Sequence, residues 1–238
     1  MRRRSPVLRE TLRVTTLLWD IDGTLMRSPG VGVKSFWRAI ETVTGIRPPK
    51  QRYDFGGKTD PLIAEELLHA VGIDNDELVP QILLAVDGGY RDLHAELVAS
   101  AVVLPGVAVL LASLAERGVG QTVVTGNIEP VARRKLAVVG LDRHLDLDAG
   151  GYGSDHPDRA QLVRQAIERM SRVHGDDPDR IWVIGDTPRD AACAEAVGIR
   201  CILVATGTFD SIRLSLCGAD AVLENLEDTT AVLSIIES

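Results

Sequence analysis

Near its N-terminus the chain reads TTLLWDIDGTL over residues 15–25. An apolar run that ends in a glycine and a hydroxyl residue is typical of a buried strand followed by a turn. A buried strand does not by itself explain the two acids at its end, because charges there cost free energy unless a metal, a partner or water compensates them. We therefore expect Asp20 and Asp22 to belong to a functional site at the end of this strand, where a cation, a partner or water compensates their charge.

The segment that follows this strand has a helical pattern and no convincing strand between residues 30 and 100. We expect loops at residues 25–33 and 45–57, and helices that begin at Lys34, span 60–71 and lie within 76–100. In the second of these helices, Asp60 is the expected N-cap and Pro61 the first helical residue.

From residue 102 onward, strand and helix patterns alternate along the chain. The expected strands lie at 120–125, 145–148, 180–184, 201–204 and 221–223, and the expected helices at 107–117, 130–139, 157–174 and 188–197. This alternation predicts an α/β fold, a three-layer core in which helices cover both faces of a parallel sheet.

The helical segment interrupts that alternation after the first strand, so we expect it to form a cap domain over the strand ends. The expected boundaries are a mobile tail at residues 1–13, the α/β core at 14–28 and 101–238, and the helical cap at 29–100.

Composition argues against several classes of partner. A formal net charge of −8 gives no reason to expect a nucleic-acid partner. The apolar runs fall short of the roughly 18 residues that a membrane span needs, and no apolar segment follows the basic start of the chain, so we expect no signal peptide. Three cysteines without metal-ligand spacing fit a reducing compartment. We expect a cytoplasmic protein that is a monomer or a homodimer.

Three of the expected strands end in reactive groups, namely Asp20 with Asp22, then Thr125, then Asp186 with Asp190. Each group has an ordinary alternative role; Asp186, for example, precedes a helix and could simply cap it. Because parallel strands end at one common edge of a sheet, we expect these groups to lie together. Two aspartates and a backbone carbonyl, with no cluster of histidines or cysteines, suit Mg²⁺.

Three short motifs resemble those of the haloacid dehalogenase superfamily of hydrolases. They are DIDGT at 20–24, VVTGN at 123–127 and GDTPRD at 185–190. The stretch LPG at 104–106 resembles the point where such chains return from cap to core. The chain is similar to the branch with a helical, C1-type cap after the first strand, and within that branch to phosphoglycolate phosphatases.

This resemblance implies a Mg²⁺-dependent phosphatase that acts on a small phosphorylated metabolite. It implies that Asp20 forms an aspartyl-phosphate, and that Asp22 protonates the leaving alcohol and later takes a proton from water. The implied metal ligands are Asp20, the Asp22 carbonyl and Asp186. The implied phosphate-binding residues are Gly23, Thr125, Gly126, Asn127 and one cation.

The cation is the point where this chain departs from the family. The family's third motif supplies a lysine before the helix that leads to residues 185–190, whereas residues 153–159 read GSDHPDR and offer Arg159. Arginine can neutralise both a phosphate and Asp20 through paired hydrogen bonds. We therefore favour Arg159 and keep Lys135 as the alternative, and we expect Asp190 to orient a metal-bound water or this basic side chain.

The expected cap contains one candidate substrate contact. Residues 56–60 read GGKTD, a glycine turn that leads into a helix. Such a turn can present amides and Lys58 to an anion, so we expect Lys58 to contact a second anionic or polar group of the substrate. An ordinary helix start with an exposed lysine is the alternative.

Three other functions stay open. A phosphomutase or phosphotransferase of the same fold differs only in what accepts the phosphoryl group. A 2-haloacid dehalogenase would use Asp20 against carbon without a metal, but in the family that activity goes with the absence of the second acid, and Asp22 is present here. A non-catalytic binder of small molecules is supported only by the missing lysine, and it would have no use for a nucleophile and acid pair.

Overall fold

The computed structural model describes residues 15–49, 53–174 and 177–237. Its main sheet has six strands in the order β5-β4-β1-β6-β7-β8, and all neighbouring pairs are parallel. The strands are β1 (Thr16–Trp19), β4 (Gly120–Thr125), β5 (Gly151–Tyr152), β6 (Ile181–Gly185), β7 (Arg200–Val204) and β8 (Ala221–Leu223). The predicted parallel α/β sheet is confirmed, whereas the tail predicted at 1–13 lies outside the described residues.

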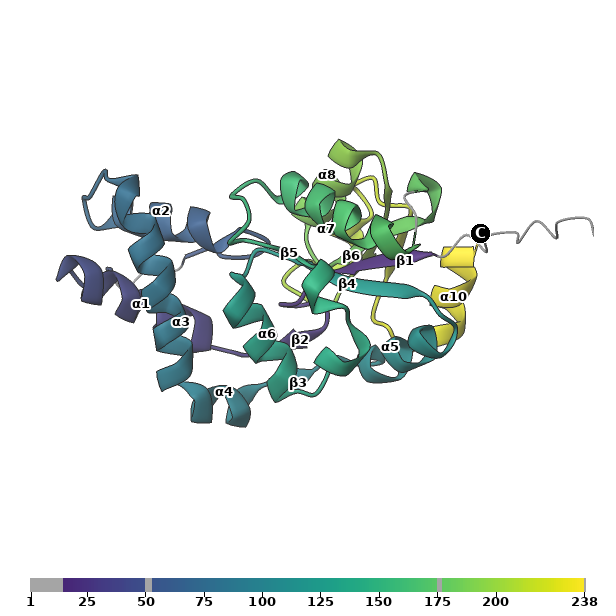
Figure 1. Cartoon of the computed structure of the whole chain (residues 1–238), viewed down its shortest axis with the longest axis horizontal. Coiled ribbons are helices and arrows are strands. Elements are labelled where there is room, and N and C mark those ends of the chain that lie inside the picture. Colours follow the sequence, from purple (N-terminus) through teal and green to yellow (C-terminus); the bar gives the residue numbers. More distant parts are fainter. Residues whose placement is uncertain (1–14, 50–52, 175–176, 238) are drawn as a thin grey trace, which may run out of the picture.

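Helices cover both faces of this sheet (Figure 1). On β1, Leu17 and Trp19 belong to one buried cluster and Leu18 to another, because successive side chains of a strand point to opposite faces. The helices that contribute to the first cluster are α5 (Val107–Glu116), α6 (Glu129–Val138) and α10 (Thr229–Glu237). Those of the second cluster are α7 (Arg159–His174), α8 (Pro188–Val197) and α9 (Ser211–Leu214).

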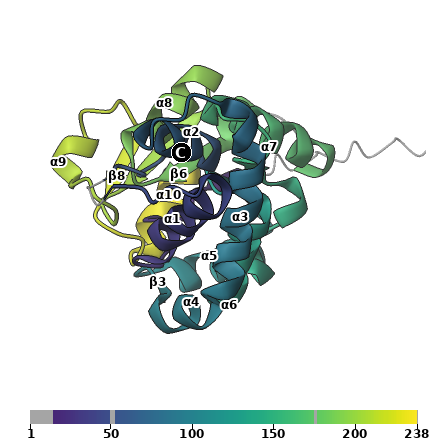
Figure 2. The same ribbon diagram turned by 90° about the vertical axis from the view of Figure 1, so that its left-hand side faces the viewer.

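A group of helices beside the sheet forms the cap. The cap helices are α1 (Val31–Thr44), α2 (Asp60–Ala70), α3 (Val79–Asp92) and α4 (His94–Ser100). Figure 2 looks onto this group and shows α1 and α3 in front of the core. The apolar cluster of the cap includes Val131 of the core helix α6 and Ile128, the N-cap residue of that helix, so cap and core share buried surface. The domain boundaries given above stay a prediction.

The connection between cap and core differs from its prediction. The loop expected at 25–33 contains β2 (Met26–Arg27) and the first residues of α1. β2 pairs antiparallel with β3 (Val102–Val103), which lies at the far end of the cap in sequence. A two-residue strand of this kind depends on a distant partner, so local pattern does not reveal it.

The strand expected at 145–148 is also wrong. The chain there forms 3₁₀ turns at Asp142–His144 and Leu147–Ala149. The Asp146 carboxylate accepts hydrogen bonds from the N–H groups of Asp148 (3.2 Å) and Ala149 (3.3 Å), which favours a turn over a ladder. The edge strand β5 begins two residues after these turns, at Gly151.

None of the helices in the described ranges is long and apolar enough to cross a membrane. The three cysteines are free thiols; Cys193 and Cys201 are buried and Cys217 is partly buried. They behave as small apolar side chains in the packing of the fold.

Candidate active site

The candidate site lies at the carboxyl edge of the sheet, where β1 ends. β1 lies between β4 and β6, at the point where the strand order reverses, which is where ligands bind in open α/β sheets. The register pairs Trp19 with both Val123 and Ile184. The residues that follow these three therefore meet at one edge.

Arg159, the first residue of α7, holds the side chain of Asp20. Arg159 Nη2 lies 2.8 Å from Asp20 Oδ1 and 2.5 Å from Asp190 Oδ1. Asp190 Oδ2 accepts hydrogen bonds from the N–H (3.0 Å) and the hydroxyl (2.8 Å) of Thr187 at the start of α8. Burial alone would lower the pKa of Arg159, but the carboxylates of Asp190 and Asp20 raise it well above its ordinary value. Arg159 is therefore a fixed cation, with Asp190 behind it.

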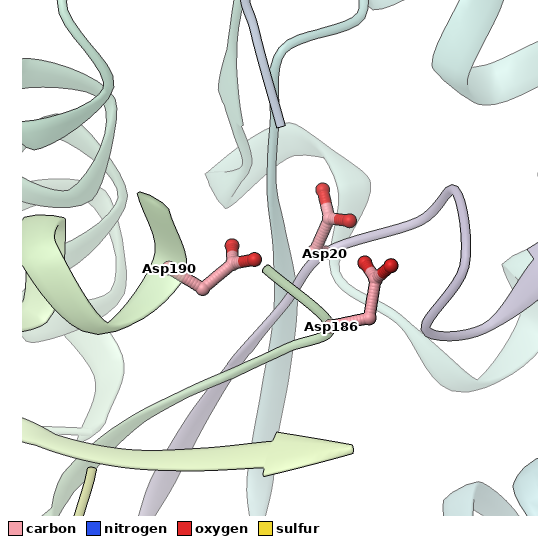
Figure 3. A group of neighbouring side chains, drawn as sticks. All are labelled: Asp20, Asp186 and Asp190. Carbon is pink, nitrogen blue, oxygen red and sulfur yellow. The ribbon is translucent and has the colours of Figure 1, made fainter. Parts of the chain in front are cut away.

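Asp186 follows β6 and is the second buried acid. One carboxylate oxygen from each of Asp20, Asp186 and Asp190 lies within 4.8 Å of the other two, and Figure 3 shows Asp190 reaching from α8 toward the other two residues. Burial raises the pKa of Asp20 to about 7 although Arg159 opposes the shift. Burial raises the pKa of Asp186 to about 8, and the charges of Asp20 and Asp190 add to the effect. Both carboxyl groups therefore favour binding a proton or a cation near neutral pH.

Asp186 does not cap the helix that follows it, because Thr187 occupies the N-cap position of α8. Two glycines leave space beside its carboxylate. A Cβ on Gly23 would lie 2.4 Å from Asp186 Oδ2, and a Cβ on Gly207 would lie 1.5 Å from the same atom. Gly23 also has a φ of +92°, which strains any other residue. The Thr24 hydroxyl donates to Asp186 Oδ1 at 3.3 Å.

The donors of this cluster fit a hard cation. Asp20 and Asp186 offer carboxylate oxygens, the ligands that Mg²⁺ prefers. The oxygens of Asp190 are already taken by Arg159 and Thr187. Asp20 and Asp186 are therefore the pair of acids best suited to hold a metal.

Asp22 has a different environment and a cation of its own. Its side chain is 45% exposed, against 7% for Asp20. Lys135 Nζ lies 2.5 Å from Asp22 Oδ2, and Asn127 Nδ2 donates to the same oxygen at 2.8 Å. Lys135 also donates to Asn127 Oδ1 at 2.7 Å and lies 5.4 Å from the centre of the Tyr90 ring. Arg159 thus contacts the first acid, whereas Lys135 contacts the second.

The start of α2 lies directly on the core. The Asp60 N–H donates to the Gly126 carbonyl at 2.7 Å, and Asp60 Oδ2 accepts a hydrogen bond from the Ile128 N–H at 2.8 Å. The sequence predicts Asp60 as the N-cap of its helix, and this prediction is wrong. Thr59 holds that position, and the Asp60 carboxylate instead bonds to the core. Burial raises the pKa of Asp60 to about 7, although the hydrogen bond from Ile128 and the charge of Lys135 oppose the shift.

The residues just before Asp60 contact the core through their backbone. Arg189 donates to the Gly56 carbonyl at 2.6 Å, and Arg159 to the Gly57 carbonyl at 3.4 Å. A Cβ on Gly126 would lie 2.0 Å from the Lys58 carbonyl oxygen. The Thr59 hydroxyl adds a hydrogen bond to the Pro157 carbonyl at 2.9 Å. The segment 56–60 is therefore docked on the core mainly by main-chain atoms, with the side chains of Thr59 and Asp60 in support.

Lys58 is close to the site, but its charge is paired within the cap. Lys58 Nζ lies 2.7 Å from both carboxylate oxygens of Glu66. Its side chain is 15% exposed. A second anionic group of a substrate would therefore have to compete with Glu66 for this lysine.

One pocket of about 490 Å³ collects most of the predicted site residues. The predicted residues that line it are Asp20, Asp22, Gly23, Lys58, Thr125, Gly126, Asn127, Arg159 and Asp186. Asp190, which lies behind Arg159, is not among the described residues that line it. The Thr125 hydroxyl accepts hydrogen bonds from the N–H and the Nδ2 of Asn127, at 3.2 and 2.8 Å.

Four residues of this site are not identified from the sequence: Thr24, Asp60, Tyr90 and Gly207. Thr24 belongs to the first motif, DIDGT, and its position in that motif is the sequence signal that could have identified it as a site residue. Tyr90 lies inside a helix without any motif, and only the folded cap brings its ring to Lys135. Gly207 follows β7 in a loop, and only its approach to Asp186 reveals its importance.

Comparisons with known proteins agree with this geometry. A family model described as haloacid dehalogenase-like hydrolase matches residues 17–195. The chain is 32% identical over 216 residues to phosphoglycolate phosphatase of Rhodospirillum rubrum, an alignment that covers 88% of this chain and 86% of that protein. It is 24% identical to the putative pyrophosphatase PpaX of Caldanaerobacter subterraneus subsp. tengcongensis, over 81% of this chain and 82% of that protein.

A solved structure, a hydrolase from Pseudomonas syringae, is similar with a TM-score of 0.69 and 22% identity, covering 92% of this chain and 98% of that chain. This likeness shows a shared fold.

Proposed function

Because this chain belongs to the haloacid dehalogenase-like hydrolase family, we propose that this phosphatase uses Mg²⁺ to hydrolyse the phosphomonoester of a small metabolite. The observation that carries the proposal is the pair of acids at the end of β1. Asp20 is buried against Arg159, whereas Asp22 is half exposed against Lys135, and both line one pocket. Two acids in contrasting environments suit two different roles in one reaction.

The residues that would hold the metal are Asp20 and Asp186, with the backbone carbonyl of Asp22. Their oxygen donors fit Mg²⁺, and the raised pKa values of Asp20 and Asp186 reflect buried negative charge that a cation would stabilise. When bound, the metal would neutralise charge between a carboxylate nucleophile and a phosphate.

The proposed reaction has two steps on the protein. Asp20 attacks phosphorus and forms an aspartyl-phosphate while the bond to the leaving oxygen breaks. Asp22 gives its proton to that oxygen, and in the second step it takes a proton from the water that attacks the phospho-enzyme. Arg159 and the amides near Gly23 and Gly126 would hold the phosphate oxygens, since phosphoryl transfer depends mainly on positioning and charge stabilisation.

The substrate we propose is a small phosphomonoester, with phosphoglycolate as the first candidate. The relative from Rhodospirillum rubrum that is named phosphoglycolate phosphatase supports this choice. The cap contributes the apolar side chains of Val33, Phe36, Phe55 and Ile63 to the pocket lining, together with the polar side chains of Lys58, Asp60 and Tyr90. Lys58 is the proposed contact for a second anionic group of the substrate, in exchange for Glu66.

The test is a phosphate-release screen over small phosphometabolites with Mg²⁺, with the Asp20→Asn variant as blank. We expect release from the wild type to require Mg²⁺, to stop with EDTA and to disappear in Asp20→Asn. The Lys58→Ala variant should raise the KM several-fold for substrates that carry a second anion and leave other KM values unchanged. If the phosphoryl group is recovered on an added sugar and not as inorganic phosphate, the protein is a phosphotransferase and the proposed hydrolysis is wrong. Activity toward a haloacid that survives EDTA would refute the proposal.

A further inference from the structure

Lys135 is a buried cation that the proposed reaction does not use. It projects from α6 of the core, and its side chain is 4% exposed. A buried lysine is unfavourable unless its charge is paired and its hydrogen bonds are satisfied. The structure satisfies it with Asp22 and Asn127 at hydrogen-bond distance and with the face of Tyr90 above it.

The hydrogen bonds of Asp22 are unequally divided between its two oxygens. Lys135 and Asn127 both donate to Oδ2, at 2.5 and 2.8 Å. Within the described ranges, Oδ1 has no hydrogen-bond partner, and Asp22 lines the pocket. Fixing one oxygen of a planar carboxylate sets the direction of the other.

From this arrangement we infer that Lys135 is a positioning residue for Asp22, which it holds with Oδ1 toward the leaving oxygen of the substrate. The inference rests on the proposed function, because it concerns the proton that Asp22 transfers. As Asp20 bonds to phosphorus and the phosphorus–oxygen bond breaks, the proton moves from Asp22 Oδ1 to the leaving oxygen. Lys135 keeps its own proton and its hydrogen bond to Oδ2 throughout.

The cap contributes to this arrangement through Tyr90. Tyr90 belongs to α3 and is 3% exposed, and its ring lies over the Lys135 ammonium. A cation over an aromatic face is stabilised, more so when water is excluded. The packed cap therefore completes the enclosure of Lys135 on the side opposite the core helix.

The leaving group of the substrate provides the test. A nitrophenolate leaves without a proton, whereas an alkoxide needs one from Asp22. We expect Lys135→Met to lower the first-turnover rate of alcohol release about 100-fold for phosphoglycolate, within the range of general acid catalysis. For p-nitrophenyl phosphate the same rate should fall less than about tenfold, and nitrophenol should appear as a burst because the later attack of water still needs Asp22.

The matched control is Arg134→Met. Arg134 is the neighbouring residue on α6 and pairs with Asp87 of the cap at 3.1 Å, so this variant removes a cation between cap and core without touching Asp22. We expect its first-turnover rates to stay within about twofold of the wild type for both substrates. If Lys135→Met does not fold, as judged by circular dichroism, Lys135→Gln, whose side chain is uncharged and one atom shorter than lysine, serves in its place with the same expected difference between the two substrates.

A double variant that also carries Asp22→Asn distinguishes a positioning role of Lys135 from a general structural role. Because Lys135 acts through Asp22, adding Lys135→Met to Asp22→Asn should lower the p-nitrophenyl phosphate rate less than about twofold further. Equal losses for both substrates in the single variant, or a further large loss in the double variant, would overturn the inference while leaving the phosphatase in place. A wild type that releases no phosphate from either substrate with Mg²⁺ would instead overturn the proposed function, and the inference with it.

Discussion

Asp20 and Asp22 are two residues apart, yet their surroundings differ in burial and in the cation that each one meets. Side chains two apart on an extended chain point the same way, but the chain turns after Trp19, where β1 ends. Asp20 stays over the sheet beside α7, whereas Asp22 lies beside α6. Each acid consequently has its own cation, Arg159 or Lys135.

The first prediction concerns Arg159. Removing it leaves Asp20 and Asp190 buried without their shared cation, so we expect Arg159→Ala to lower kcat at least about 100-fold, as loss of a fixed transition-state donor does elsewhere. Steady-state phosphate release at saturating Mg²⁺ measures the effect. Arg164→Ala is the control, because Arg164 is an exposed residue of the same helix whose guanidinium donates to the Ala196 carbonyl at 2.9 Å. Full turnover in Arg159→Ala would exclude the proposed role.

At the scale of elements, the start of α2 determines how the cap meets the core. Its contacts are made by the carbonyls of Gly56 and Gly57 and by the N–H of Asp60. Gly126 permits this approach because it has no Cβ to collide with the Lys58 carbonyl. The close contact therefore depends on glycines on both sides.

The second prediction tests this contact with Gly126→Ala. Its Cβ would lie 2.0 Å from a backbone oxygen, so the segment 56–60 must move away. We expect faster hydrogen–deuterium exchange of the Asp60 and Ile128 amides and a lower kcat/KM. Gly88→Ala is the control, since nothing lies within 4 Å of its added Cβ and alanine favours a helix over glycine by about 1 kcal/mol. Unchanged exchange in Gly126→Ala would show that the cap does not depend on this approach.

The elements and residues that the sequence predicts are those with a local pattern. β1, β4 and β6 combine an apolar run with a polar end, so their existence is predictable, and the meeting of Asp20 with Asp186 follows from the general geometry of parallel sheets. The order of the strands in the sheet is known only from the structure. β2, β3 and β5 are two residues long and exist through partners elsewhere in the chain. Asp60 resembles a helix cap in sequence, and only the approach of Ile128 gives its carboxylate a different partner.

At the scale of the whole molecule, the part of the chain that the structure describes contains three buried carboxyl groups with raised pKa values. They are Asp20 at about 7, Asp60 at about 7 and Asp186 at about 8, and burial is the main cause for each. Each group binds its proton more tightly in the folded chain than in the unfolded chain. Their contribution to stability is therefore complete below about pH 4 and is lost as the pH rises to about 8.

The third prediction follows from this sign. Without metal, the melting temperature should fall as the pH rises from about 5 to about 8. A Mg²⁺ ion held as proposed by the ionised carboxylates of Asp20 and Asp186 should raise the melting temperature more at pH 8 than at pH 6. Thermal unfolding in EDTA and in Mg²⁺ measures both effects.

Two variants show which carboxyl groups cause the Mg²⁺-induced shift and which cause the pH dependence in EDTA. Asp186→Asn should remove most of the Mg²⁺-induced shift, whereas Asp60→Asn should keep the shift and make the slope in EDTA shallower. A Mg²⁺-induced shift of the same size at both pH values would contradict the assignment of Asp20 and Asp186 as metal ligands.

The main-chain docking of the cap also bears on how such a protein can evolve. Near Gly126, the backbone groups of Gly56, Gly57 and Asp60 contact the core, so these contacts place no demand on the side chains that line the pocket elsewhere in the cap. Side chains such as Phe36, Phe55 and Ile63 face the pocket from the cap. Substitutions there can alter which molecule is accepted while leaving these docking contacts in place. Mutational drift in substrate preference is thereby separated from the machinery of the reaction.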